Sequence, residues 1–177
     1  MFCQFLFLRS CVQFIALERL ESLYKSCDYV SNLCVHATPG ANNPVAVIFP
    51  HEANLRHAIS LSTDPALARL QEADFAAICS DPYVKHLVLK ECNAVGAKNG
   101  LKGPEVLCGV VLTPEEWTPE TGLVSAAMKL KRNVVAQVFE KDIKVSGHYH
   151  LGLFVSLIEY PAGRVRLSMK LPPNLHL

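Results

Sequence analysis

The feature that most limits the fold of this chain is a short apolar run enclosed by two prolines. Residues 44–50 read PVAVIFP, so only apolar residues lie between Pro44 and Pro50. The run is too short for an ordinary helix, and its apolar residues are continuous rather than alternating, which is typical of a strand buried on both faces. We therefore expect residues 44–50 to form the central strand of a sheet that is covered on both sides.

The flanking segments predict how this sheet is completed. Residues 30–38 resemble a second strand, and the turn residues PGANN at 39–43 separate them from the central strand, which predicts a β-hairpin. Residues 106–112 are rich in Val and Leu and predict a further strand. The sheet is thus expected to hold a hairpin and at least one additional strand.

Helices are expected between and after these strands. Their predicted ranges are 16–27, a short segment after His51, 64–79, 82–99 and 134–143. Asp-Pro steps at 64–65 and 81–82 supply a capping residue and a proline at the first helical position. Glu21 stands four residues before Lys25, a spacing that allows a weak helical ion pair. The predicted fold class is α+β, a small mixed sheet with a hairpin packed by three or four helices.

The most informative segment follows the strand at 106–112. It contains the single Trp of the chain, Trp117, between Pro114 and Pro119, which interrupt regular structure. A Thr-Gly turn and the run LVSAAM come next, followed by KLKR at residues 129–132. We expect a stiff, exposed loop that presents three cations after a run of small and apolar residues.

These cations, Lys129, Lys131 and Arg132, allow two interpretations. They can form a solvated basic turn, the usual meaning of clustered charges. Alternatively, one Lys is held out to neutralise a phosphate or carboxylate, a role that suits a compact charge on a flexible stem. Spacing alone does not decide between the two.

Composition bounds the remaining possibilities. A chain of 177 residues suits one domain with a sizeable core. The net charge of +1 lacks the basic excess of a nucleic-acid-binding protein. Seven Cys residues without a Cys-x-x-Cys pair argue against a zinc site or a disulfide framework. We expect reduced, buried thiols in an intracellular protein.

The two ends of the chain differ from its middle. Residues 1–14 are apolar but too short to span a membrane, and we expect a strand or buried arm there rather than a targeting signal. Residues 145–177 match nothing known and are expected to form a strand and a Pro-rich end. We expect this tail to be foreign sequence, for example from intron read-through. His148 and His150 would share a face of that strand, but two His without a third ligand indicate no metal site.

One segment carries a family resemblance. WTPETGLVSAAMKLKR, residues 117–132, resembles the C-terminal signature of the long-chain acyl-CoA synthetases, adenylate-forming (AMP-binding) enzymes that act as fatty acid–CoA ligases. Their segment reads roughly W-T-P-E-x-G-L-V-T-A-A-x-K-x-K-R, so Ser125 stands in place of a Thr. The resemblance extends over about residues 15–144 and is greatest to fungal members.

The resemblance implies a C-terminal lid, a small α+β subdomain that closes over the active site. In the family, a fatty acid reacts with ATP to give an acyl-adenylate, which coenzyme A (CoA) then converts to a thioester; ATP, CoA and Mg²⁺ are the implied cofactors. Lys129 matches the lysine that assists adenylation. Lys131 and Arg132 are expected to support the fold or to contact CoA.

Several family features are not found. The ATP-binding motif and the fatty-acid pocket belong to a large N-terminal domain, and neither they nor the hinge motif with its Asp and Arg occurs here. A Gly-Glu-Tyr-like turn is replaced by Val12-Gln13-Phe14. We therefore expect a truncated lid that is inactive alone. The alternative is a non-catalytic module or truncated gene product that acts through protein partners. The implied location is intracellular, cytoplasmic or peripheral on endoplasmic reticulum, lipid droplet or peroxisome membranes.

Overall fold

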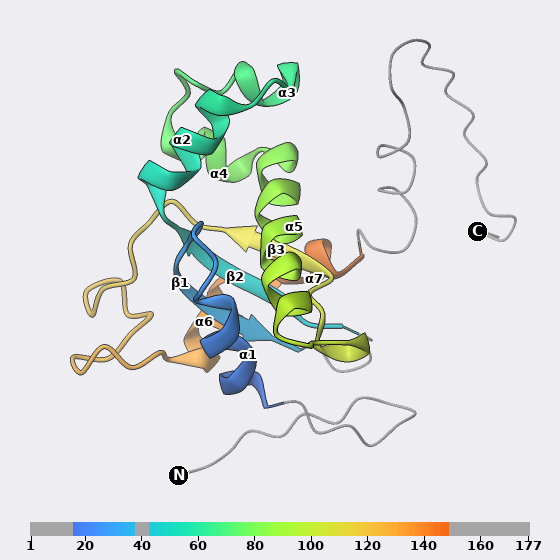
Figure 1. The fold of residues 1–177 in the computed structure, drawn as a ribbon. Coiled ribbons are helices and arrows are strands. Elements are labelled where there is room, and N and C mark those ends of the chain that lie inside the picture. The colour runs from blue at the N-terminus through green and yellow to red at the C-terminus, as the bar shows by residue number, and fades with distance from the viewer. Residues whose placement is uncertain (1–15, 38–42, 149–177) are drawn as a thin grey trace, which may run out of the picture.

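The computed structural model describes residues 16–37 and 43–148 of the chain (Figure 1). Within them, three strands form one sheet in the order β1-β2-β3. The strands are β1 (Val30–His36), β2 (Val45–Pro50) and β3 (Gly109–Leu112). β1 pairs antiparallel with β2, whereas β3 pairs parallel with β2. This small mixed sheet confirms the predicted α+β class, although residues 39–42 of the expected hairpin turn lie outside the described part.

Helices cover both faces of the sheet. In chain order they are α1 (Leu17–Tyr24), α2 (Glu52–Leu61), α3 (Pro65–Ala68), α4 (Phe75–Ser80), α5 (Pro82–Lys98), the 3₁₀ turn η1 (Gly103–Glu105), α6 (Arg132–Val138) and α7 (Glu140–His148). Figure 1 shows α1 and α5 on the near face of the sheet and α6 behind it. None of the helices in the described ranges is long and apolar enough to cross a bilayer.

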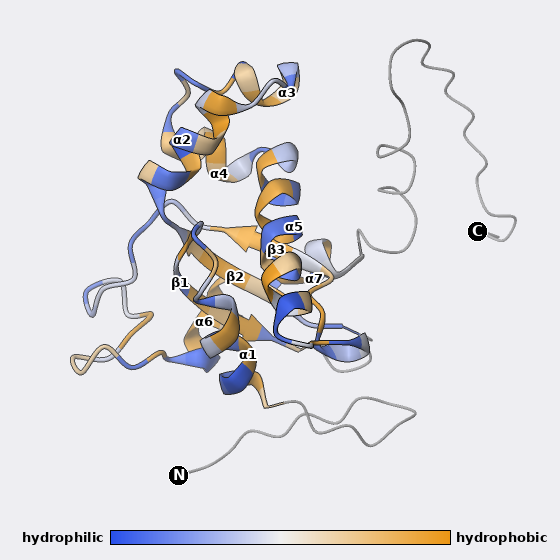
Figure 2. Cartoon of the chain, viewed as in Figure 1, coloured by the Kyte–Doolittle hydropathy of each residue, from blue (hydrophilic) through white to orange (hydrophobic). Residues whose placement is uncertain are grey.

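The central position of β2 follows from its apolar sequence. Ala46 and Ile48 point into a core shared with α1, α2, α4 and α5, whereas Val45 and Val47 point into a second core on the opposite face. All four side chains are buried. The hydrophobic colouring along the sheet in Figure 2 reflects this arrangement. The prediction of a central strand buried on both sides is therefore confirmed.

The second core is built largely by the segment after β3. Its buried members are Cys34, Val45, Val47, Cys108, Val111, Trp117, Leu123, Val124, Val135 and Ile143. Trp117 is almost completely buried there, so the single Trp is a core residue rather than part of an exposed loop. The segment with the three cations is thus anchored to the sheet through its apolar residues.

The capping signals predict the start of α5 correctly but lead to one predicted helix that is too long. Asp81 accepts a hydrogen bond from the Tyr83 N–H at 2.8 Å, and α5 begins and ends close to the predicted residues. The expected helix over residues 64–79 is wrong, because α3 and α4 are separate. Asp74 has an extended backbone and starts α4, and Arg56 Nη1 donates to the Ala73 carbonyl at 3.0 Å in the interruption.

The expected helix at 134–143 is also two helices, α6 and α7, which meet at Phe139. α7 continues to His148, so the strand expected from residue 145 is wrong at its start. His150 and the rest of the tail, like the N-terminal arm, lie outside the described residues. The Cys residues described by the structure are all buried and free, and no described cluster of three His, Cys, Asp or Glu could hold a metal.

Candidate functional site

The segment between β3 and α6 leaves the sheet and returns to it. It starts at Thr113, whose N–H donates to the Ile48 carbonyl at 2.9 Å and so continues the β2–β3 pairing by one residue. Pro114 and Pro119 are exposed on either side of the buried Trp117. In Figure 1 this segment, coloured yellow to orange, protrudes from the left of the sheet, away from α5. Trp117 therefore fastens a protruding segment to the second core.

The end of this segment is a short hairpin, residues 123–131, which we call the lysine hairpin. Val124 and Leu130 form an antiparallel bridge. The Ser125 N–H donates to the Lys129 carbonyl at 2.8 Å, and the Lys131 N–H donates to the Leu123 carbonyl at 2.9 Å. The base of the hairpin is therefore tied by its own backbone.

The tip of the lysine hairpin is exposed, as predicted, but its base is not. Leu123 and Val124 are buried, whereas residues 126–129 are exposed. Met128 has a φ of 55° and a 62% exposed side chain. A left-handed backbone is uncommon for a residue with a side chain, and here it closes the tight tip. The sequence predicts an exposed loop throughout this run; burial of Leu123 and Val124 makes it an anchored turn.

Lys129 occupies the end of this tip. Its N–H donates to the Ser125 hydroxyl at 3.2 Å, which holds the backbone on both sides of the tip together. None of the ion pairs formed among the described residues involves its ammonium group. The structure thus presents Lys129 as an exposed cation on an anchored turn.

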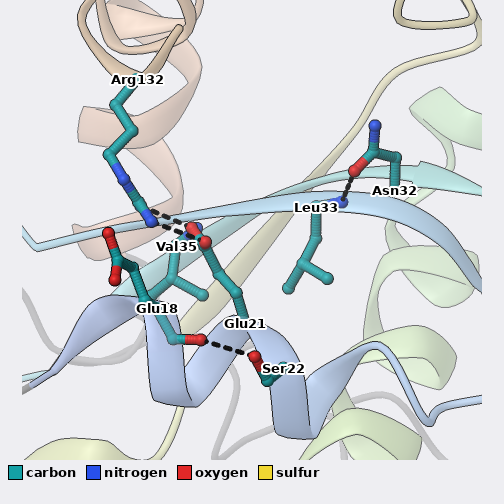
Figure 3. Close-up of polar contacts among 7 residues, drawn as sticks. All are labelled: Glu18, Glu21, Ser22, Asn32, Leu33, Val35 and Arg132. Carbon is teal, nitrogen blue, oxygen red and sulfur yellow. Dashed lines mark hydrogen bonds and ion pairs between the residues drawn. The ribbon is translucent and has the colours of Figure 1, made fainter. Parts of the chain in front are cut away.

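The other two cations lie in different settings. Lys131 is exposed and takes the N-cap position of α6. Arg132 is the first residue of α6, and its side chain is only 23% exposed. Its Nη1 and Nη2 donate to the two carboxylate oxygens of Glu21 at 2.6 and 2.7 Å (Figure 3). The sequence-based picture of three loop cations is therefore wrong for Arg132.

Glu21 connects three elements through its carboxylate. Besides the two bonds from Arg132, Oε1 accepts the Val35 N–H at 2.8 Å (Figure 3). Burial acts to lower the pKa of Arg132, but the hydrogen bonds and charge of Glu21 raise it above its usual value, so the guanidinium stays charged. The pair expected between Glu21 and Lys25 is replaced by this contact, because Glu21 faces β1 and α6 rather than solvent.

Sequence reasoning had no signal for the Glu21–Arg132 contact. The two residues are 111 positions apart, and each lies in a locally ordinary setting. Glu21 falls on the polar face of a predicted amphipathic helix, and Arg132 ends a basic run. They meet because α1 and α6 both pack against β1.

Comparison with known proteins identifies relatives of this chain by sequence. No family model matches the chain. It is 37% identical over 132 residues to long-chain-fatty-acid–CoA ligase 4 of Saccharomyces cerevisiae, and 37% identical over 131 residues to long-chain-fatty-acid–CoA ligase 1 of Schizosaccharomyces pombe. These matches cover 75% and 74% of this chain but only 18% and 19% of the relatives. The chain therefore spans about a fifth of their length.

Solved structures show the same fold at lower identity. The chain resembles the A-PCP didomain of carboxylic acid reductase from Segniliparus rugosus, solved in complex with AMP, at a TM-score of 0.58 and 21% identity. That match covers 75% of this chain and 16% of the reductase chain. The adenylation domain of the carboxylate reductase from Mycobacterium chelonae matches at a TM-score of 0.57. Over about three quarters of its length this chain is therefore homologous to a segment of the long-chain-fatty-acid–CoA ligases, and its fold is the one found in the matching part of the carboxylic acid reductase adenylation domains.

Proposed function

We propose that the chain is the C-terminal lid of a long-chain fatty-acid–CoA ligase and that Lys129 is its adenylation lysine. The observation behind this proposal is the position of Lys129, exposed at the tip of a hairpin whose base is buried and hydrogen-bonded. A cation that must enter another domain's active site needs an accessible end and a fixed base. The lysine hairpin combines the two.

The proposed chemistry has two steps. A carboxylate oxygen of the fatty acid forms a bond to the α-phosphorus of ATP, and pyrophosphate leaves with its electron pair. The sulfur of CoA, after losing its proton, then attacks the acyl carbon, and AMP leaves. Because two anions must approach each other in the first step, a positioned ammonium lowers its barrier by orientation and charge stabilisation. Lys129 is proposed for that step, and Mg²⁺ as the counter-ion of ATP.

Lys131 and Arg132 are assigned different roles. The exposed side chain of Lys131 leaves it available for a phosphate of CoA. Arg132 is held by Glu21 in a two-point contact, which favours a role in the fold over direct CoA binding. Of the two roles expected for these cations, each residue is thus proposed to take one.

Substrate binding is proposed to need the rest of a full-length ligase. The chain covers less than a fifth of its Saccharomyces relative, so most of that ligase's length lies outside the matched segment. We propose that the isolated chain is inactive and works only when joined to a body that binds ATP and the fatty acid. We also propose that such an enzyme works in the cytoplasm or on the surface of intracellular membranes.

Reconstitution tests this function. A homologous ligase body that lacks its own C-terminal segment is mixed with this chain, a fatty acid and ATP, and pyrophosphate release is measured. We expect the wild-type chain to restore release and Lys129→Ala to fail. Lys141→Ala, which removes an exposed cation from α7, serves as the charge-matched control. Equal recovery by wild type and Lys129→Ala would reject the assignment.

A second candidate function rests on exposed apolar residues. Val138 on α6 and Val145 on α7 are 60% and 52% exposed. They favour the alternative of a folded module that binds a protein partner without catalysis. Self-association that Val138→Ser abolishes in a sizing experiment would support this alternative, and a monomer that restores catalysis to the ligase body would count against it.

A further inference from the structure

The contact between Glu21 and Arg132 affects more than local stability, because Arg132 adjoins the lysine hairpin. Arg132 directly follows the lysine hairpin and stands three residues after Lys129. We propose that Glu21 and Arg132 are positioning residues that fix the lysine hairpin relative to the sheet and thereby aim Lys129. This inference rests on the proposed function of Lys129 in adenylation.

The first step of the argument is that fixing Arg132 fixes the hairpin. Lys131, its neighbour, donates its N–H to the Leu123 carbonyl at the other side of the hairpin base. The Val124–Leu130 bridge and the Ser125–Lys129 hydrogen bonds then continue the pairing up to the tip. Arg132 is the next residue after Lys131 of the hairpin base, so an orientation imposed at Arg132 is passed to Lys129.

The second step is that Glu21 is itself tied to the sheet. Its side chain is 12% exposed and accepts the Val35 N–H in addition to both Arg132 nitrogens. Val35 belongs to β1 and pairs with Ala46 of the central strand. Two parallel charge-assisted hydrogen bonds define an angle as well as a distance. The hairpin is therefore oriented against the sheet rather than against a mobile side chain.

The third step is a comparison within the same helix. Arg19 of α1 also forms an ion pair, with Glu105, but through one contact at 3.3 Å and with the Arg side chain 62% exposed. Exposed single-point pairs contribute little because solvent competes for both charges. Arg19→Gln therefore changes one charge of α1 without touching the hairpin and is the matched control.

Amide hydrogen exchange on the full chain tests the positioning directly, without any assay of activity. In Glu21→Gln we expect the amides of Ser125 and Lys131 to exchange about tenfold faster, as the hairpin base opens more often. The amide of Val47 in β2 should be unchanged, and Arg19→Gln should resemble wild type. Unaltered exchange at Ser125 and Lys131 in Glu21→Gln would overturn the inference.

The reconstituted adenylation reaction then separates aiming from simple loss of folded protein. A misaimed Lys129 lowers the maximal rate at saturating chain by about 10- to 100-fold, with an unchanged half-saturating concentration of the chain. A partly unfolded chain raises the half-saturating concentration and keeps the maximal rate. We expect the first pattern for Glu21→Gln, and the second pattern overturns the positioning role.

The same assay distinguishes failure of this inference from failure of the proposed function. If Lys129→Ala abolishes recovery and Glu21→Gln matches wild type, Lys129 acts in adenylation but Glu21 does not aim it. If Lys129→Ala recovers as well as wild type, the proposed function itself fails. The exchange experiment still reports whether Glu21 holds the hairpin.

Discussion

Gly109 and Ser146 meet where β3 packs against α7, and a Cβ atom added to Gly109 would lie 2.7 Å from the Ser146 carbonyl oxygen. The Ser146 hydroxyl also donates to the Val110 carbonyl at 3.4 Å. The close approach of α7 to the sheet therefore requires a residue without a side chain at position 109. It also shows that residues beyond Lys144, the expected end of the lid, contribute to the packed structure.

Gly109→Ala is expected to destabilise the protein by about 1–3 kcal/mol, because the added methyl group must displace backbone atoms of α7. Gly147→Ala is the matched control, since within the described residues its Cβ would meet no atom nearer than Val45 Cγ2 at 3.8 Å. It should be neutral or slightly stabilising, because Ala is favoured over Gly in a helix. Urea unfolding measures both variants, and equal stability of the two would contradict the contact.

The start of α5 gives a second prediction. Asp81 accepts the Tyr83 N–H and also binds Arg69 Nη2 at 2.6 Å, so Asp81→Ala should lower the free energy of unfolding by about 1–2 kcal/mol. Asp74 takes the same position before α4 but makes no side-chain capping bond. Asp74→Ala should therefore cost much less. Thermal unfolding compares the two, and similar losses would show that capping does not explain the effect.

Tyr24 predicts how stability depends on pH. Burial raises its pKa from 10.0 to about 12, and its hydroxyl donates to the Glu105 carbonyl at 2.9 Å. Because the pKa of Tyr24 is higher in the folded than in the unfolded state, protonated Tyr24 contributes fully to the free energy of unfolding below the unfolded pKa, near 10. This contribution is lost as the pH rises through about 12. The free energy of unfolding should then fall by up to about 1.4 kcal/mol per pH unit in that interval.

Tyr24→Phe supplies the control for that measurement. It removes the hydroxyl and lowers stability at neutral pH, but the variant should lose less stability than wild type between about pH 10 and about pH 12. Urea unfolding at several pH values gives both profiles. Parallel profiles would mean that Tyr24 ionises in the folded protein as easily as in the unfolded chain.

Ser125 predicts the role of the hairpin tip. Ser125→Ala removes the hydroxyl that accepts the Lys129 N–H, and the loss of one hydrogen bond of about 1 kcal/mol should lower reconstituted adenylation about fivefold. Ser125→Thr keeps the hydroxyl and should retain the rate. If Ala and Thr behave alike, the hydroxyl does not restrain Lys129.

Local patterns predicted the parts of the fold that local chemistry determines. The Asp81-Pro82 step marked the start of α5, and the continuous apolar run in residues 44–50 marked a strand buried on both faces. The parallel pairing of β3, the break before Asp74 and the burial of Arg132 against Glu21 were not predictable in this way. Each depends on segments distant in sequence, and no spacing rule reports which of them pack together.

The position of Lys129 shows the same division. Its identity as a candidate came from a motif, whereas its presentation on an anchored hairpin came from the structure. Lys129 and Arg132 both belong to the motif that carries the resemblance. The motif does not show that Lys129 is exposed and that Arg132 is held in an ion pair with Glu21. Contacts made that distinction.

The carboxylate of Glu21 also accepts a backbone N–H on the outer side of β1. Among the strands of the described ranges β1 lies at one edge, where the Val35 N–H donates to Glu21 Oε1 and the Leu33 N–H donates to Asn32 Oδ1. Unoccupied amides on an edge strand are a template onto which another chain can add a strand, the first step of β-aggregation. The side chain proposed to aim a lysine thus also occupies an N–H group that an added strand would otherwise use.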